Sequence, residues 1–413
     1  MAEPRLPIVI RRGTPAFLRA NIAFFLSALA IFASLYSVQP LLPIFANEFS
    51  LDAGAASLAL SATTATLAVS LLFASWVADR LGRRTLMVWA ILLTAALGLL
   101  LPFAPNWWSL IAIRTVMGLT LSGLPAVAMV YIAEEMEPDA LGFSMGLYIG
   151  GTAIGGMAGR LLSGVFADWF GWRPALVALG IAVAIAALAV VLLLPRPQNS
   201  TRTRIGLRDL AHLIRVQFND PGLPWLFASA FLLMGSFVTL YNYAGFRLAE
   251  PPFELSHAAI ATIFVVYLLG SASSAWAGGL AQRLGRRKVY WGFVVVMAAG
   301  VFLTLIPFTP AIIAGLAIAT AGYFAAHGIA SAWVARRAQI GRAQASAIYL
   351  FAYYLGSSAL GTLGGYAWVM WGWNGVMMVS GGAALAAMLV AWRLFFLPVL
   401  PVPERPAEPP SGI

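Results

Sequence analysis

The densest charge in this chain lies in two short turns that repeat one another. The first turn contains, in order, Asp79, Arg80, Leu81, Gly82, Arg83 and Arg84. The second repeats its Arg-Leu-Gly-Arg-Arg core 203 residues later, as Arg283, Leu284, Gly285, Arg286 and Arg287. The chemistry open to these side chains is electrostatic, because a guanidinium forms charge-assisted hydrogen bonds with a carboxylate, and the positive N-terminal end of a helix attracts an anion such as Asp79. Both turns can therefore form charged contacts at the ends of the helices that flank them.

Two carboxylates are available to the first turn. Glu134 and Glu135 close an apolar run, and we name them as candidate partners for Arg83 or Arg84. The alternative interpretation is that all of these groups belong to a solvated surface at the inner end of the spans.

Two arginines and one histidine lie well inside apolar runs, away from the ends of the runs: Arg114, Arg160 and His327. A guanidinium inside a bilayer is costly and should face the bundle interior or a wet cavity, although either arginine can alternatively snorkel toward the interface. Arg160 can also pair with Asp168 or attract an anionic substrate. His327 is either a proton carrier or a hydrogen-bonded packing residue.

No Asp or Glu occupies the middle of any apolar run, and this bears on how ions could be moved. Proton-coupled carriers usually depend on a carboxylate or histidine whose pKa changes between states. The coupling candidates are Glu134, Glu135 and His327, which can exchange a proton, and the two arginines inside the runs, Arg114 and Arg160. The counter-ion of the two arginines can be a carboxylate or phosphate of the substrate, and backbone carbonyls with water are the alternative.

Polar and aromatic residues within the runs are candidates for lining a central substrate cavity. They are Tyr36, Gln39, Tyr148, Thr152, Tyr241, Asn242, Tyr267, Tyr349 and Tyr353. An aromatic cavity suits an amphiphilic or lipophilic solute. For each tyrosine taken alone, the alternative is ordinary packing.

The elements that must position these residues are membrane helices. Hydrophobic residues make up 61% of the 413 residues and charged residues only 10%, against about 25% charged in soluble domains. A span needs about 20 apolar residues. Twelve segments fit: 17–39, 53–77, 85–103, 107–131, 142–166, 174–194, 223–246, 258–280, 288–307, 310–334, 344–368 and 374–397. The first resembles a signal peptide at its basic start, but its length predicts a retained span.

The distribution of basic residues predicts the orientation. All but four of the 25 Lys and Arg residues fall in the N-terminal segment, alternate loops or the C-terminal end. By the positive-inside rule, both termini are cytoplasmic. The net charge of +10 therefore indicates membrane orientation, and we expect no nucleic-acid partner.

The repeated turn divides the chain into two similar halves, as in transporters built from internal repeats. We predict an N-terminal six-helix bundle over 1–194, a cytoplasmic linker over 195–222, a C-terminal six-helix bundle over 223–398 and a disordered tail over 399–413. A short amphipathic helix is predicted at about 206–217, either on the inner membrane surface or serving only as a tether.

Several classes of function are excluded by what the sequence lacks. There is no cysteine and there are only three histidines, so we expect no metal site. No phosphate-binding Gly-x-x-x-x-Gly-Lys-Ser/Thr loop is present, which disfavours transport driven by ATP. We find no catalytic set within the apolar runs, and we expect neither an enzyme nor a cofactor.

The two turns resemble the loop signature of the major facilitator superfamily, Gly-x-x-x-Asp-Arg-x-Gly-Arg-Arg/Lys. The first copy has Ser75 in place of the glycine, and the second has Gln282 in place of the acid. The resemblance implies an all-α integral membrane protein with the major facilitator fold, twelve transmembrane helices in two six-helix pseudo-symmetric bundles. It also implies that both turns form a gating motif, in which Asp79 helps to latch the second span to the eleventh when the cavity faces outward. Arg114 is similar to the arginine of the family's Arg-x-x-Gln-Gly motif, whose suggested role is proton coupling, with Met117 replacing the glutamine.

The fifth span is rich in glycine at intervals of four, which lets helix backbones approach closely. Its packing candidates are Gly151, Gly155, Gly156 and Gly159. The stretch resembles the antiporter signature Gly-x-x-x-Gly-Pro-x-x-Gly-Gly, with Gly156 replacing the proline and Arg160 replacing the last glycine. Together with the stretch 36–43, it resembles the YnfM-type branch of efflux permeases, which is related to arabinose-efflux and drug–proton antiporters.

These features predict a secondary active transporter of a small organic solute that works by alternating access and proton-coupled efflux. The alternative is an organic-anion uptake symporter or anion exchanger of the same fold. We expect a multi-pass monomer in the lipid bilayer of a bacterial inner membrane, with a small-molecule substrate and protons as partners.

Overall fold

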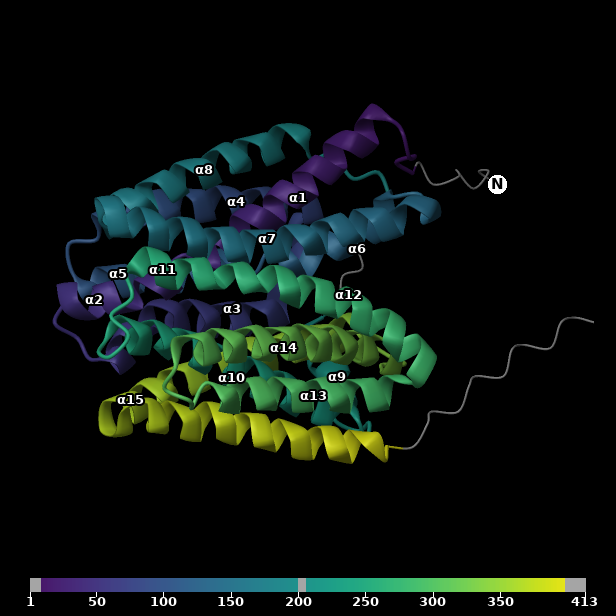
Figure 1. Ribbon diagram of the computed structural model, residues 1–413. Helices are drawn as coiled ribbons and strands as arrows, with labels where there is room; N and C mark the ends of the chain where they lie inside the picture. The colour runs from purple at the N-terminus through teal and green to yellow at the C-terminus, as the bar shows by residue number, and fades with distance from the viewer. Residues whose placement is uncertain (1–8, 200–205, 398–413) are drawn as a thin grey trace, which may run out of the picture.

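The computed structural model describes residues 9–199 and 206–397. Within these residues the only extended pairing is an isolated bridge between Ile10 and Met136, and the rest is helix and connecting turns. The long helices run roughly side by side as one bundle (Figure 1). The predicted all-α class is confirmed.

The described part of the first half, residues 9–199, contains eight α-helices. They are α1 (Pro15–Tyr36), α2 (Leu42–Glu48), α3 (Ala53–Leu81), α4 (Arg83–Leu100), α5 (Trp107–Leu121), α6 (Pro125–Glu135), α7 (Pro138–Phe170) and α8 (Trp172–Leu193). Two short 3-10 helices, η1 (Gln39–Leu41) and η2 (Leu101–Phe103), extend α1 and α4.

The second half follows a short connecting helix, α9 (Leu207–Gln217). Its helices are α10 (Leu223–Ala249), α11 (His257–Thr262), η3 (Ile263–Val266), α12 (Tyr267–Leu284), α13 (Arg286–Leu303), α14 (Thr309–Arg337) and α15 (Arg342–Phe395). In Figure 1, α1, α4, α7 and α8 form one group and α10, α13, α14 and α15 another, with α3 and α12 between them.

By length and composition, nine helices of the described residues can cross a membrane. Each of the twelve predicted segments falls on a helix or a pair of helices. Three of the predicted spans are missing from this count of nine. One is divided between α5 and α6, and another is α13, which has three basic residues in its first turn. The third is missing because α15 contains two predicted spans in one element. The count of twelve spans stays a prediction.

The structure corrects two details of the predicted spans. The segment 107–131 is broken between Leu121 and Pro125, because proline lacks the N–H that would continue the helix. The intervals left between predicted spans at 167–173 and 369–373 are almost entirely helical. Each contains one non-helical glycine with positive φ, Gly171 (+85°) or Gly372 (+56°), a conformation that disfavours residues with a Cβ.

The linker joins the two halves through α9, close to the predicted range. Leu210 of this helix is buried, and Gln217 Nε2 donates to the carbonyl of Ile340 at 2.9 Å. These contacts hold α9 against the first turn of α15. The predicted tail over 399–413 lies outside the described residues, and the division into two six-helix bundles stays a prediction.

The glycines of α7 lie where this helix crosses α1. A Cβ on Gly155 would overlap the backbone of Leu29, and one on Gly159 would overlap that of Ala33. Gly151 faces the carbonyl of Phe25 in the same way. Gly156 instead faces Arg160 and the ring of Tyr36. The glycines at intervals of four thus permit the close approach of two backbones, and this fixes the position of Arg160 beside α1.

Candidate functional site

The two basic turns have the same backbone shape. Gly82 joins α3 to α4 with φ of +90°, and Gly285 joins α12 to α13 with φ of +88°. Positive φ favours glycine, which explains why this residue recurs in both copies. Arg84 and Arg287, which follow at matching places, donate to carbonyls at the C-terminal ends of α8 and α15.

Within the first turn, the charged residues have different partners. Arg83 forms an ion pair with Glu134 of α6, one of its two candidate partners. Glu135 is 1% exposed and accepts hydrogen bonds from the backbone N–H groups of Gln198 and Asn199. Arg80 is exposed and lies over the ring of Trp76 at 3.5 Å.

Within the second turn, Arg286 lies 5.9 Å from the ring of Trp333. Among the described residues, neither Arg286 nor Arg283 forms an ion pair, so this copy lacks the counterpart of the Arg83–Glu134 contact.

A cavity of about 200 Å³ opens at this basic end of the bundle. Asp79 and Arg83 line one side, and Gln344, in the first turn of α15, lines another. Leu210 of α9 completes the wall. Asp79 forms no ion pair within the described part of the chain, and it faces α15 across this space.

Arg114 is buried among three helices and fully occupied by backbone. Its Nε donates to the carbonyl of Ala59 at 2.7 Å, and its two Nη atoms donate to the carbonyls of Ser34 and Leu35 at 3.0 and 2.8 Å. It is 0% exposed, so it does not snorkel toward the interface. Of the partners considered for it, backbone carbonyls are the ones present.

Arg160 is also buried, at 2% exposed, but its surroundings are different. Its Nε donates to Gln39 Oε1 at 2.6 Å, and its Nη1 donates to the carbonyl of Gly156, one turn earlier on α7, at 2.7 Å. The guanidinium carbon lies 3.8 Å from the ring centre of Tyr36 and 4.7 Å from that of Tyr267. Asp168 is exposed and forms no ion pair with it.

Gln39 continues this polar contact into the second half of the chain. Its Nε2 donates to Asn242 Oδ1 at 2.7 Å, and both side chains are buried. The two residues are 203 residues apart, the same interval as the two basic turns, so they occupy matching positions of the repeat.

Other contacts close the same end of the bundle, opposite to the basic turns. Ser358 Oγ of α15 donates to the carbonyl of Ser61 in α3 at 2.9 Å. The backbones of Gly54 and Gly365 meet so closely that a side chain on Gly365 would overlap Gly54. The space left near Gln39 and Tyr241 is only about 10 Å³. One end of the interface is therefore sealed, while the other contains the larger cavity.

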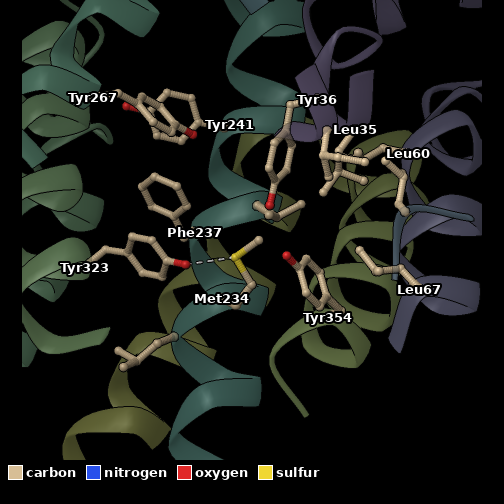
Figure 2. Packing of buried hydrophobic residues seen from close by; sticks show 14 of the residues in the cluster. Leu35, Tyr36, Leu60, Leu67, Met234, Phe237, Tyr241, Tyr267, Tyr323 and Tyr354 are labelled. Atoms are coloured by element: carbon tan, nitrogen blue, oxygen red, sulfur yellow. Dashed lines mark hydrogen bonds between the residues drawn. The ribbon is translucent and has the colours of Figure 1, made fainter. Parts of the chain in front are cut away.

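Aromatic side chains fill the centre between these ends. Figure 2 shows Tyr36 of α1 and Tyr354 of α15 directed toward Met234 of α10, whose sulfur accepts a hydrogen bond from the Tyr323 hydroxyl at 3.0 Å. Tyr241 and Tyr267 lie together beyond Phe237 in the same view. Both halves of the chain contribute to this region, and it contains no carboxylate among the described residues.

The candidate cavity residues separate into two groups. The first group lies around Arg160 and its neighbours and consists of Tyr36, Gln39, Tyr241, Asn242 and Tyr267.

A second group surrounds His327 of α14. Its Nδ1 lies 3.0 Å from the Tyr349 hydroxyl, and its ring lies 4.8 Å from that of Tyr353. The Tyr148 hydroxyl is buried without a partner in the described chain. The Thr152 hydroxyl donates to the carbonyl of Ile149 in its own helix, and no contact joins it to either group.

Sequence reasoning missed several members of the central region. Phe264 lies 5.3 Å from the Arg160 guanidinium, and Tyr323 donates to the Tyr353 hydroxyl at 2.7 Å. Phe237 stacks on Tyr323 with ring centres 4.0 Å apart. All three lie within predicted apolar runs, and a search that took every aromatic residue in every run, phenylalanines included, would have found them.

Comparison with known proteins agrees with this fold. The model of the Major Facilitator Superfamily matches residues 24–250 and 248–412. The chain is 46% identical to the inner membrane transport protein YnfM of Escherichia coli K12, over 92% of this chain and 90% of that one. It is 40% identical to the MFS-type transporter YybF of Bacillus subtilis 168, over 89% and 91%.

Solved structures show the same architecture at low sequence identity. A bacterial homologue of the human lysosomal transporter Spinster superposes with a TM-score of 0.73 at 16% identity, over 93% of this chain and 97% of that one. A D-xylose–proton symporter superposes with a TM-score of 0.71 at 17% identity, over 92% and 97%. From the repeated turns, the helical bundle, the family match and these relatives, we conclude that the chain belongs to the Major Facilitator Superfamily of membrane transporters.

Proposed function

We propose that the chain moves a small organic solute across a bacterial inner membrane by alternating access, and that proton-coupled efflux is its mode. The observation that carries the proposal is the contrast between the two ends of the interface. Contacts such as Gln39–Asn242 seal one end, and the cavity lined by Asp79 and Gln344 opens at the other. Opening the sealed end while closing the cavity exposes the central aromatic region to the other side.

The basic turns act as the latch at the open end. Arg83 is held by Glu134, and Asp79 faces the first turn of α15 across the cavity. When the cavity closes, the N-terminal end of α15 approaches Asp79, and the partial positive charge there favours the carboxylate. The latch would then hold the state that is open at the opposite end.

The orientation follows from charge. The basic turns, α9 and the last turn of α15 lie at one end, and we place this end and both termini in the cytoplasm. The relation to YnfM, an inner membrane transport protein, supports the location. The family and its relatives are transporters, which fits the expectation that the chain is not an enzyme. We propose that it works as a monomer.

Efflux is supported by the packing of α7 on α1. The glycines that resemble the antiporter signature are those that let these helices touch, as at Gly155 and Leu29. Arg114 joins the same part of α1 to α3 and α5 through carbonyls. We assign it a role in coupling, since displacing any of these helices breaks its contacts. His327 and the pair of Arg83 with Glu134 remain the groups that can exchange a proton.

A second mode, uptake or exchange of an organic anion, is favoured by Arg160. This guanidinium is buried with no carboxylate partner in the described chain.

Proton movement in energised inside-out vesicles that contain the purified chain, followed with a pH-sensitive dye, tests these modes. Sugars, amino acids, organic acids and lipophilic cations are added in turn. Release of protons on adding a neutral or cationic compound supports antiport. The absence of any response, together with accumulation of labelled anion, would favour the second mode.

A further inference from the structure

We propose that Arg160 binds the anionic head of the substrate, and that the same guanidinium holds the sealed end closed through Gln39 and Asn242. The substrate class is then a small organic anion with an aromatic or apolar body. The proposal rests on the second mode proposed above, uptake or exchange of an organic anion, and names the ligand and the gate of that site.

The two buried arginines differ in the hydrogen-bond acceptors around their guanidinium groups. This difference indicates a packing role for Arg114 and a binding role for Arg160. Arg114 is surrounded by carbonyls, one for each of its three nitrogens. Arg160 has an amide oxygen for Nε and a carbonyl for Nη1, and its flat face meets the rings of Tyr36 and Tyr267. Among the described residues, no carbonyl or carboxylate accepts from its Nη2. Arg160 therefore has hydrogen-bonding capacity that these two acceptors do not use.

The fold itself does not require an arginine here. The alignment of the two halves that pairs Gly156 with Gly361 also pairs Arg160 with Gly365. Gly365 packs against the backbone of Gly54. At the matching position, the second half therefore packs its helices with a glycine and no side chain. A charge placed in one half only, without a counter-ion, indicates a ligand that supplies the counter-ion.

Unpartnered polar atoms surround this charge. Asn242 Nδ2 has no acceptor, although the side chain is 1% exposed. The hydroxyl of Tyr267, at 5% exposed, also lacks a partner, while its ring lies against Arg160. Buried donors without acceptors are costly, and a carboxylate with two oxygens can satisfy both the guanidinium and a nearby donor. The aromatic side chains around Tyr36 and Phe237 fill this region in the structure (Figure 2), so they must move apart to receive the apolar body.

The gate follows from competition for Arg160 Nε. Gln39 bridges the halves because its Oε1 accepts from Arg160 and its Nε2 donates to Asn242. A carboxylate is a stronger acceptor for a guanidinium than a neutral amide. An anion that takes the place of Gln39 Oε1 frees the amide, weakens its contact with Asn242, and lets the sealed end open. A neutral or cationic ligand has no such effect.

The binding test uses three compounds that differ only in their head group: 4-hydroxyphenylacetate, its neutral amide and the cation tyramine. Calorimetry on the purified full chain should detect the anion only. Arg160→Gln should weaken that binding by about 10- to 100-fold, the range expected for a lost charge-assisted hydrogen bond. Gln39→Glu should weaken it similarly, because the new carboxylate occupies the guanidinium. Arg160→Lys should retain part of the affinity, since the charge remains.

The gate is read separately, from the opening of the sealed end. The chain has no cysteine, so Ser358→Cys introduces a single thiol at that end. The anion should increase its reaction with a membrane-impermeant maleimide, and the amide should not. Asn242→Ala should raise the reaction without any ligand, because Gln39 then loses its partner in the second half. This readout needs no bound anion, so it tests the gate separately from the anchor.

Each outcome decides one part. Equal binding of the three compounds, or anion binding unchanged in a folded Arg160→Gln protein, would overturn the anchor while leaving the transport function standing. Anion binding with unchanged thiol reactivity would overturn the gate. Specific anion binding without solute movement in vesicles would retain the site and reject the proposed transport mode.

Discussion

Arg84 and Arg287 perform the same structural task in the two halves of the chain. Arg84 Nε and Nη2 donate to the carbonyls of Leu194 and Val191 at 3.0 and 3.2 Å, and Arg287 Nη1 donates to that of Phe395 at 3.3 Å. The last carbonyls of a helix lack partners within it, and a cation there is favourable. Each basic turn thus fastens the end of the last helix in its own half.

Replacing these caps should lower stability to different extents. Arg84→Ala should cost about 1–3 kcal/mol, since two charge-assisted hydrogen bonds are lost, and Arg287→Ala less. The measurement is the midpoint of thermal unfolding in detergent. Arg80→Ala is the matched control, because Arg80 is exposed and contacts only the ring of Trp76. Equal midpoints for all three variants would contradict the capping role.

The latch makes a prediction about transport rather than stability. Arg83→Ala or Asp79→Asn should abolish transport in vesicles with expression intact, because the closed cavity loses the charges that hold it. Exchanging the pair as Arg83→Glu with Glu134→Arg should restore part of the activity lost in either single variant, since the ion pair re-forms. Full transport by Arg83→Ala or Asp79→Asn would remove the latch from the mechanism.

We expect proton coupling to depend on the contacts that Arg114 makes with the neighbouring helices. Arg114→Ala leaves the carbonyls of Ser34, Leu35 and Ala59 without their donor, and we expect proton-driven flux to disappear while solute exchange across vesicles without a gradient persists. Arg114→Lys keeps the charge but lacks the planar fork, so it should not restore coupling. If coupled flux survives in the alanine variant, Arg114 has a structural role only.

The glycines of α7 offer a comparison within one helix. Gly155→Ala places a methyl group against the backbone of Leu29 and should destabilise the protein by about 1–3 kcal/mol, as overpacking does. Gly146→Ala has nothing within 4 Å of the new atom and should be neutral or slightly stabilising, because alanine favours the helix. The measurement is the fraction of each variant that remains folded after a heat step, compared with the unsubstituted chain. Equal losses would argue against close packing at Gly155.

Much of this protein is determined by its sequence, because the relevant signals are local. Long apolar runs can cross a bilayer only as helices or closed barrels, so the spans follow from composition and length. Gly82 and Gly285 mark their turns because positive φ favours glycine, and the recurrence of Arg-Leu-Gly-Arg-Arg reveals the repeat. The break before Pro125 was also readable in principle, since the cause is the proline itself.

The tertiary structure decided which partner each polar group takes. Arg114 and Arg160 are both buried arginines in apolar runs. Nothing in the sequence around them predicts that carbonyls enclose Arg114 while Arg160 faces tyrosine rings. The difference depends on how each helix is rotated about its axis, which is set by packing against other helices. The same holds for the bridge from Gln39 to Asn242, since two residues 203 positions apart meet only when both halves are assembled.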